Sequence, residues 1–433
     1  MTVAPRTSLG RLIPALLVSQ VGFYVALLTP VQLLLTLRLT DIAGDDATSA
    51  FGVVTGFGAL VALVFNPIAG RISDRTVWLF GRRHTWILTG ALAGAAALVA
   101  LGAATAVWQV VVLWCFVQAL FNFQYAATNA LVADQVPAER RGGVSGLVGL
   151  TIALGPLSGL ALANSFDAGS SLQWTAVAVV AAIAGVVAVV LLRDTPASRT
   201  VAQSGGSFLR TFWINPRRHP AFGWAWLVRF LITCAYASSS YNAFFLLQRF
   251  DVSEDEVGAT VLQLSLISVV LLAVTSVAAG YLSDAVRRQK PFIVFAGVIA
   301  AAALVMMAFA PSLTVVYLAT GLLGIGTGAF FAIDLAMCVR VLPSTEDAGK
   351  DLAIINIANS LPQSVVPFVA PLLLAIGGYS ALFGFLAVLG LLGAASVLRV
   401  PEIGQENDEN GRTAPITRHD LVHKTASDER TLA

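Results

Sequence analysis

The feature that most constrains this chain is a succession of apolar stretches, each about as long as a helix that crosses a lipid bilayer. Crossing about 30 Å of hydrocarbon takes about 20 apolar residues in a helix. By that measure the candidate spans are residues 12–37, 50–72, 85–105, 108–134, 143–164, 173–192, 221–248, 257–282, 291–310, 312–341, 351–376 and 379–398. The pattern predicts an all-α membrane protein with twelve transmembrane helices in two six-helix, pseudo-symmetric bundles.

Composition supports a lipid environment. Apolar residues make up 57% of the 433 positions and charged residues only 12%, whereas about 25% of residues are charged in soluble domains. A soluble chain of this length would have to hide nearly all of these side chains in its core, but a bilayer solvates them directly. The formal net charge of +2 gives no reason to expect a nucleic-acid partner.

Two polar stretches divide the chain. We expect an N-terminal six-helix bundle, a cytoplasmic central loop, a C-terminal six-helix bundle and a disordered cytoplasmic tail, at residues 1–192, 193–220, 221–400 and 401–433. The first apolar stretch is longer than the core of a signal peptide, so we expect no cleavable signal.

The distribution of basic residues orients the helices. If both termini are cytoplasmic, only Arg38 and Arg249 among the 26 Lys and Arg residues lie on the outer side. The outer loops carry acidic residues instead, namely Asp41, Asp45, Asp46, Asp251, Glu254, Asp255 and Glu256. Because basic residues collect on the cytoplasmic side, we expect a multi-pass protein of the cell membrane with both termini in the cytoplasm.

The two halves repeat at a shift of about 210 residues. Gly70-Arg-Ile-Ser-Asp74 ends the second span and Gly280-Tyr-Leu-Ser-Asp284 ends the eighth, and a basic cluster follows each. Both copies begin on the same side of the membrane, so the repeat is parallel, about an axis along the membrane normal.

The first copy of this repeat resembles the signature that major facilitator transporters carry between helices two and three. Its residues here are Gly70, Asp74, Arg75, Gly81, Arg82 and Arg83. The resemblance implies the major facilitator fold and a transporter that works by alternating access. It also implies a cargo site between the halves, near the membrane midplane.

Two details are similar to the sucrose-type, glycoside–cation symporter branch of that superfamily. Five residues separate Arg75 from Gly81, and Asn129-Ala-Leu-Val-Ala-Asp134 resembles the fourth helix of the branch. Sucrose transporters carry an Arg where this chain has Asn129. The departure removes a cation that would hold sugar hydroxyls or a coupling carboxylate.

A different motif favours export. Gly155-Pro-Leu-Ser-Gly159 resembles part of the antiporter motif of drug exporters, although Thr151 and Leu160 replace two of its glycines. Small residues also allow close helix contact without any such role. The alternatives are therefore a drug or metabolite proton antiporter, and a non-transporting sensor on the same fold.

The signature predicts a cytoplasmic gate. Asp74 ends the second helix, and in the family such a carboxylate sits at the positive N-terminus of helix eleven, which here begins near Lys350 and Asp351. The basic residues that open helix three can pair with Asp134. The expected gate is formed by Gly70, Asp74, Arg75, Gly81, Arg82, Arg83, Asp134, Gly280 and Asp284. The alternative interpretation is a set of solvated charges that only fix topology.

Two charged residues lie inside spans, where charges are rare and usually functional. Arg229 in helix seven and Asp334 in helix ten each lie about seven residues, or about 10 Å, from the cytoplasmic boundary. We expect them to pair, with Asp334 as the proton-coupling carboxylate. Burial favours a protonated carboxyl group and a guanidinium favours the ionised one, so a changing separation would change proton affinity. A permanent pair would be purely structural.

Neutral polar residues on several helices are candidates for cargo binding. They are Gln20, Tyr24, Asn122, Tyr125, Asn129, Tyr236, Asn242 and Asn359. Asn122, Tyr125 and Asn129 share one helical face. The set favours a polar, neutral small molecule such as a sugar or glycoside, although many such groups merely bridge helices.

The sequence gives no support for an enzyme. All four histidines lie in predicted cytoplasmic segments, no span contains a Glu, and neither HExxH nor GxSxG occurs. The cysteines Cys115, Cys234 and Cys338 lie in apolar stretches without metal-ligand spacing, so we expect buried thiols. We therefore predict no cofactor and no metal, with a small-molecule substrate, protons and the lipid bilayer as partners of a monomer.

Overall fold

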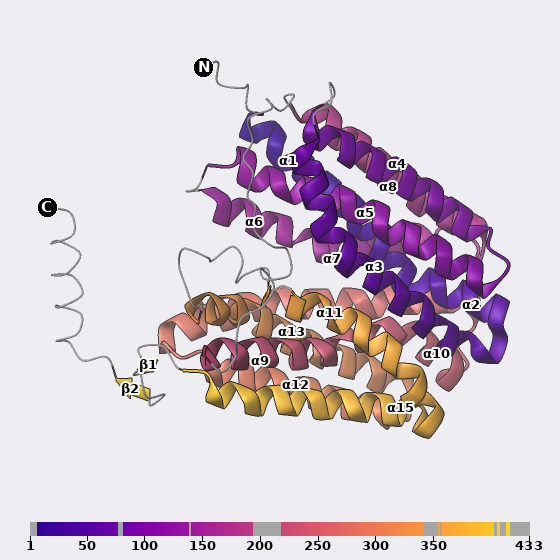
Figure 1. Ribbon diagram of the computed structural model, residues 1–433. Coiled ribbons are helices and arrows are strands. Elements are labelled where there is room, and N and C mark those ends of the chain that lie inside the picture. The colour runs from indigo at the N-terminus through magenta and orange to yellow at the C-terminus, as the bar shows by residue number, and fades with distance from the viewer. Residues whose placement is uncertain are drawn as a thin grey trace, which may run out of the picture.

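The computed structural model describes residues 7–76, 81–137, 140–193, 218–341, 354–355, 357–401, 405–407 and 413–415, and these are almost entirely helical (Figure 1). Within these ranges, ten helical segments are long and apolar enough to cross a membrane. The two longest, Leu9–Arg75 and Ile357–Arg399, turn back at Gly44 and at Gly377 and Gly378, where the backbone leaves the helical region. Counting each as two crossings agrees with the twelve spans that the sequence predicts.

Helices α1 to α8 form the N-terminal half. Their bounds are Leu9–Thr29 (α1), Leu35–Ala43 (α2), Ala47–Arg75 (α3), Arg82–Gly102 (α4), Val107–Gln135 (α5), Arg141–Gly149 (α6), Thr151–Ala163 (α7) and Ser171–Leu191 (α8). The short 3-10 segment η2 spans Gly44–Asp46.

The C-terminal half follows the same plan. Its helices are Pro220–Tyr236 (α9), Asn242–Phe250 (α10), Glu254–Val286 (α11), Lys290–Ala308 (α12), Leu313–Arg340 (α13) and Pro362–Ser396 (α15), followed by the 3-10 segment Val397–Arg399 (η6). In the tail, for which we expected no regular structure, Gln405–Asn407 (β1) and Thr413–Pro415 (β2) form one antiparallel pair.

The first helix of each half is interrupted near its middle. Between α1 and α2 lies the π-helical segment Pro30–Leu34 (η1), which begins at a proline that has no N–H to donate. Between α9 and α10 lies the 3-10 segment Ala237–Tyr241 (η5), which contains consecutive serines that compete with helical hydrogen bonding. The two interruptions contact each other across the interface between the halves.

Small residues allow the helices within each half to pack closely. Gly90 of α4 lies against the backbone of α5, Gly185 of α8 against Ala91, and Gly324 of α13 against the backbone of α11. Large apolar side chains such as Phe57 and Ile376 are exposed on the outside. In a bilayer, helix association depends on this kind of close packing between small residues.

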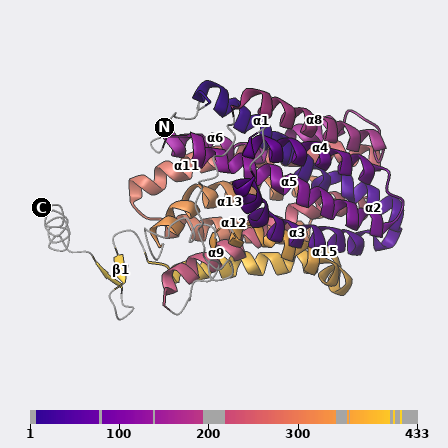
Figure 2. The same ribbon diagram turned by 45° about the horizontal axis from the view of Figure 1, so that its top comes forward.

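The halves meet at one end of the molecule and separate toward the other (Figure 1). We call the end with Arg75, Arg82 and Arg287 the basic end, and the end with Asp45 and Glu254 the acidic end. Contacts between halves join α3 to α15 and α7 to α11, and Figure 2 shows α3 beside α15.

Glycines show where these contacts are tight. At the acidic end, a side chain on Gly52 or Gly56 of α3 would meet Pro367, Phe368 or Pro371 of α15. Toward the basic end, a Cβ atom built on a glycine of α3, α6 or α11 meets no atom within 4 Å, as at Gly70, Gly142, Gly143, Gly146 and Gly280. Within the described ranges, the tight contacts between the halves thus lie at the acidic end, and the halves separate toward the basic end (Figure 1).

Candidate functional site

A buried ion pair lies inside the C-terminal half. Arg229 Nη1 of α9 lies 2.8 Å from Asp334 Oδ2 of α13, and the two side chains are 10% and 1% exposed. The sequence predicts this pair because these are the charges that lie well inside spans. Desolvating two ions is costly, and within the described residues Asp334 Oδ2 has no hydrogen-bond partner, so its contact with Arg229 is an ion pair without hydrogen-bond geometry.

Further polar groups lie on the same face of α9. Arg229, Thr233 and Tyr236 follow one another at helical spacing, one turn apart. Among the described residues, Arg229 Nε and Thr233 Oγ1 are buried without a hydrogen-bond partner. The Tyr236 ring lies 6.1 Å from that of Phe330 and 6.4 Å from that of Phe331. This face is polar and incompletely satisfied within the described residues, which is unusual for buried groups and makes it a candidate site.

In the N-terminal half, a pair of amides joins α1 to α5. Gln20 Nε2 donates to Asn129 Oδ1 at 2.8 Å, while Gln20 Oε1 is buried without a partner in the described ranges. Asn122 donates its Nδ2 to the Gln118 carbonyl of its own helix at 2.8 Å. Two of the predicted cargo residues therefore contact each other, whereas Asn122 bonds locally.

An aromatic cluster lies beside these amides. The Phe23 ring stacks on Tyr125 with centroids 4.5 Å apart and packs edge-on against Tyr24 at 5.1 Å. The centroids of Tyr24 and Tyr125 are 6.5 Å apart. Both tyrosines are partly exposed. Sequence reasoning missed Phe23, because an apolar ring in a span carries no signal of its own.

The remaining predicted cargo residues lie in the C-terminal half. Asn242 opens α10 directly after η5, and Asn359 precedes α15. Each has an Oδ1 atom that is buried without a hydrogen-bond partner within the described segments. In those segments no hydrogen bond links the N-terminal set of cargo residues to the C-terminal set.

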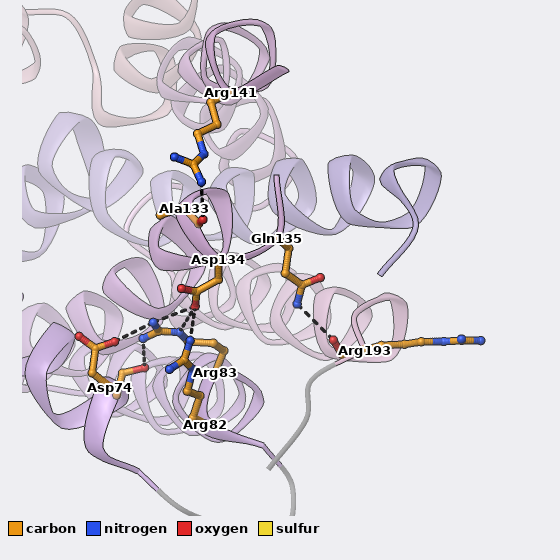
Figure 3. Close-up of polar contacts among 9 residues, drawn as sticks. Asp74, Arg82, Arg83, Ala133, Asp134, Gln135, Arg141 and Arg193 are labelled. Carbon is orange, nitrogen blue, oxygen red and sulfur yellow. Dashed lines mark hydrogen bonds and ion pairs between the residues drawn. The ribbon is translucent and has the colours of Figure 1, made fainter. Parts of the chain in front are cut away.

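At the basic end of the N-terminal half, one guanidinium holds two carboxylates (Figure 3). Arg83 Nη2 lies 2.7 Å from Asp74 Oδ1 and 2.9 Å from Asp134 Oδ2, and its side chain is only 4% exposed. Arg82 Nη2 adds a contact of 2.8 Å to Asp134. Arg83 also donates to Ser73 Oγ at 2.9 Å. Helices α3, α4 and α5 are thereby joined, as the resemblance implies for Asp134.

The other predicted gate residues have separate surroundings. Gly81 precedes α4 with φ of 91°, a conformation that only glycine adopts easily. Arg75 ends α3 and is exposed. In the second copy of the motif, Gly280 faces open space and Asp284 makes no ion pair within the described ranges. Lys350 and Asp351, where the partner helix of Asp74 is expected to begin, lie outside the described residues, as do 194–217 of the central loop.

The acidic end is closed by aromatic packing between the halves. Phe51 of α3 lies edge-on to Tyr241 and to Phe244, with centroids 5.3 Å apart in each case. The Tyr241 hydroxyl donates to the Pro367 carbonyl at 3.0 Å. All three rings are fully buried. This closure was not predicted, because apolar residues in spans do not show in sequence which of them face another half.

Comparison with known protein families identifies the family to which the chain belongs. A model described as Major Facilitator Superfamily matches residues 12–271 and 238–423. The chain belongs to the Major Facilitator Superfamily. Two overlapping matches to one model are what a chain with two related halves produces. A search of curated proteins finds no match.

Solved structures of major facilitators show the same fold. A point mutant of the nucleoside transporter NupG has a TM-score of 0.70 at 13% identity, covering 90% of this chain and 99% of that one. The D-xylose-proton symporter scores 0.67 at 16% identity, covering 90% and 97%. A bacterial homologue of the human lysosomal transporter Spinster, inward-facing and unoccupied, scores 0.62 at 15% identity, covering 90% and 98%. At these identities the likeness establishes the fold alone.

Proposed function

We propose that this major facilitator is a secondary active transporter that moves a polar, uncharged small molecule, a sugar or glycoside, together with protons. The observation that carries the proposal is the Arg229–Asp334 pair, which places an ionisable carboxylate 1% exposed inside one half. Charges at membrane depth are expensive and mark ion or proton pathways. A D-xylose-proton symporter and a nucleoside transporter among the similar folds support a hydroxylated cargo.

In this proposal the basic end is cytoplasmic, and the structure corresponds to the inward-open state. The tight contacts of Gly52 with α15 at the acidic end support this assignment, as does the open space around Gly70 and Gly280. The Arg83 network then belongs to the cytoplasmic gate. Its contacts join α3, α4 and α5 within one half, so it holds that half rigid as the halves rotate.

Cargo contacts come from both halves. The Gln20–Asn129 amides and the Tyr24 and Tyr125 hydroxyls offer donors and acceptors from the N-terminal half. The C-terminal half offers Tyr236, Asn242 and Asn359, and the Oδ1 atoms of the two asparagines have no hydrogen-bond partner within the described residues. Neutral amides and hydroxyls suit the hydroxyls of a sugar. Asn122 donates a hydrogen bond to its own helix, so it contributes less to cargo binding.

A proton antiporter is the alternative that the sequence raises. The glycines of its partial motif have a packing role here, because Gly155 lies against Tyr24 and Gly159 against Thr29. Side chains at either position would collide with α1, so close packing of α7 on α1 accounts for both. The motif therefore adds little support for export.

The test is uptake by the purified protein in proteoliposomes. Radiolabelled D-xylose, an aryl glycoside, uridine and a lipophilic cationic dye are each offered with and without a pH gradient that is alkaline inside. The proposal predicts accumulation of a neutral hydroxylated compound that requires the gradient. Accumulation of the dye driven by the opposite gradient would support the antiporter. Uptake of a sugar that equilibrates without responding to either gradient would contradict proton coupling.

A further inference from the structure

A thiol lies against the buried ion pair, in contact with both of its members. Cys338 follows Asp334 by one turn of α13, and its Sγ atom lies 3.7 Å from Asp334 Oδ1. The same Sγ lies 4.0 Å from Arg229 Nη1. Cys338 is 0% exposed. The two oxygens of the carboxylate therefore have different partners, with the guanidinium on Oδ2 and the thiol on Oδ1.

The chemistry of a thiol suits this position. A thiol is a weak donor through S–H and a weak acceptor through sulfur, so Cys338 can donate to the carboxylate while its sulfur accepts from the guanidinium. The donated bond favours the ionised carboxylate, because it is made to the charged form. It also lies along α13 itself, so it does not depend on the separation between α9 and α13.

Among the described residues, few other charged or polar groups lie near this carboxylate. Of the helices packed on α13, α9 presents Arg229, which pairs with Asp334, and the Tyr236 side chain two turns further along. The charged residues of α11 and α12 in the described ranges lie in the first or last turns of those helices, at Glu254, Asp255, Glu256, Asp284 and Lys290. Within the part of the chain that the structure describes, the immediate polar contacts of Asp334 are thus Arg229 and Cys338.

We propose that Cys338 is a positioning residue for proton coupling, whose thiol holds Asp334 toward Arg229 and sets the pH at which the carboxylate takes up its proton. The inference rests on the proposed coupling role of Asp334. When α9 moves relative to α13 within the C-terminal half and Arg229 withdraws, the contact between Cys338 and Asp334 remains, because both residues lie on α13. Cys338 then keeps the carboxylate in one orientation through both states of the cycle.

The alternative is that Cys338 only packs, as most buried cysteines do. Three variants separate the two roles. Cys338→Ala removes the donor and leaves a space of one sulfur atom, whereas Cys338→Ser keeps a donor and strengthens it. Cys234→Ala is the matched control, because Cys234 is also buried, at 1% exposed, on a neighbouring helix and makes no hydrogen bond to Asp334.

The measurement is infrared spectroscopy of the full-length protein in lipid, across the pH range in which carboxyl groups titrate in proteins. The protonated Asp334 carbonyl band is assigned by its loss in Asp334→Asn. A hydrogen bond of ordinary net strength corresponds to a change of about twofold to tenfold in the proton concentration at the midpoint. We expect that change toward higher pH in Cys338→Ala and toward lower pH in Cys338→Ser. The Cys234→Ala midpoint should match wild type.

The outcomes distinguish the two proposals. Midpoints of wild-type value in both Cys338 variants would overturn the positioning role, and so would equal shifts in the same direction, which indicate a packing effect. The absence of any titrating Asp334 band would overturn both proposals. If the Cys338 variants shift the band as expected while Asp334→Asn still accumulates cargo uphill, Cys338 orients the Asp334 carboxylate, but its part in coupling fails together with the coupling role of Asp334.

Discussion

The closure of the acidic end can be tested by adding one methyl group. A Cβ atom on Gly52 would lie 2.6 Å from the Pro367 carbonyl oxygen and 2.5 Å from Pro371 Cγ. Ordinary contact begins at 3.4 Å, so the oxygen lies about 0.8 Å too close. The atoms in the way belong to the α15 backbone and to a proline ring, and neither can move away by rotating a flexible side chain. Overpacking of this kind costs about 1–3 kcal/mol, and only the closed state bears that cost. Gly52→Ala should therefore shift the equilibrium about 5- to 150-fold toward opening at the acidic end.

Distances between spin labels report the shift. The two labels are placed at Asp45 and Glu254, which lie on opposite halves at the acidic end. Cys115 is replaced by serine, because it is partly exposed and would otherwise take up label. Gly52→Ala should lengthen the distribution between the labels. Gly384→Ala is the matched control, because a Cβ atom there meets no atom within 4 Å. If Gly52→Ala and Gly384→Ala give the same distribution as wild type, the reasoning about closure is wrong.

Three further changes test the topology, the gate and the ion pair. Cysteine labelling from outside intact cells should modify a probe at Asp45 but not one at Arg140, and the reverse would invert the assignment of the basic end. Arg82→Ala removes one contact within the N-terminal half to a partly exposed carboxylate, worth less than about 1 kcal/mol, so the protein should insert normally. The less rigid half should change the transport rate and the inward/outward balance, and unchanged values of both would refute a gating role. Arg229→Met leaves Asp334 buried and unpaired, which should cost about 3–5 kcal/mol of stability in a thermal unfolding assay, whereas adding Asp334→Leu should restore most of it.

Much of the architecture could be predicted because membrane depth restricts the choices. Span lengths follow from the bilayer, and a charge within a span has few possible partners. Arg229 and Asp334 were therefore paired correctly from sequence, and so were Asp134 and the arginines that open α4. Gly81, the glycine before α4, has a positive φ, and this explains why the motif has a glycine at that position. The motif by itself does not give that reason.

The missed residues share a different property. Phe51, Tyr241 and Phe244 close the acidic end, but each is one of many large apolar residues in a span. Nothing in sequence separates a ring that faces lipid from one that faces the other half. Cys338 was taken as a buried thiol, and only its distance to Asp334 gives it a role. Contacts that depend on the relative placement of helices require the structure.

The proposed transport cycle depends on Asp334, which we propose couples protons to cargo. The most direct measurement compares wild type with Asp334→Asn in proteoliposomes, using a compound that the wild-type protein accumulates. Two rates are recorded for each, accumulation against a concentration gradient driven by protons and exchange of labelled for unlabelled cargo at equal pH. We predict that Asp334→Asn loses accumulation and retains exchange, because the neutral amide keeps the shape of the site but cannot carry a proton. Full proton-driven accumulation by Asp334→Asn would contradict it.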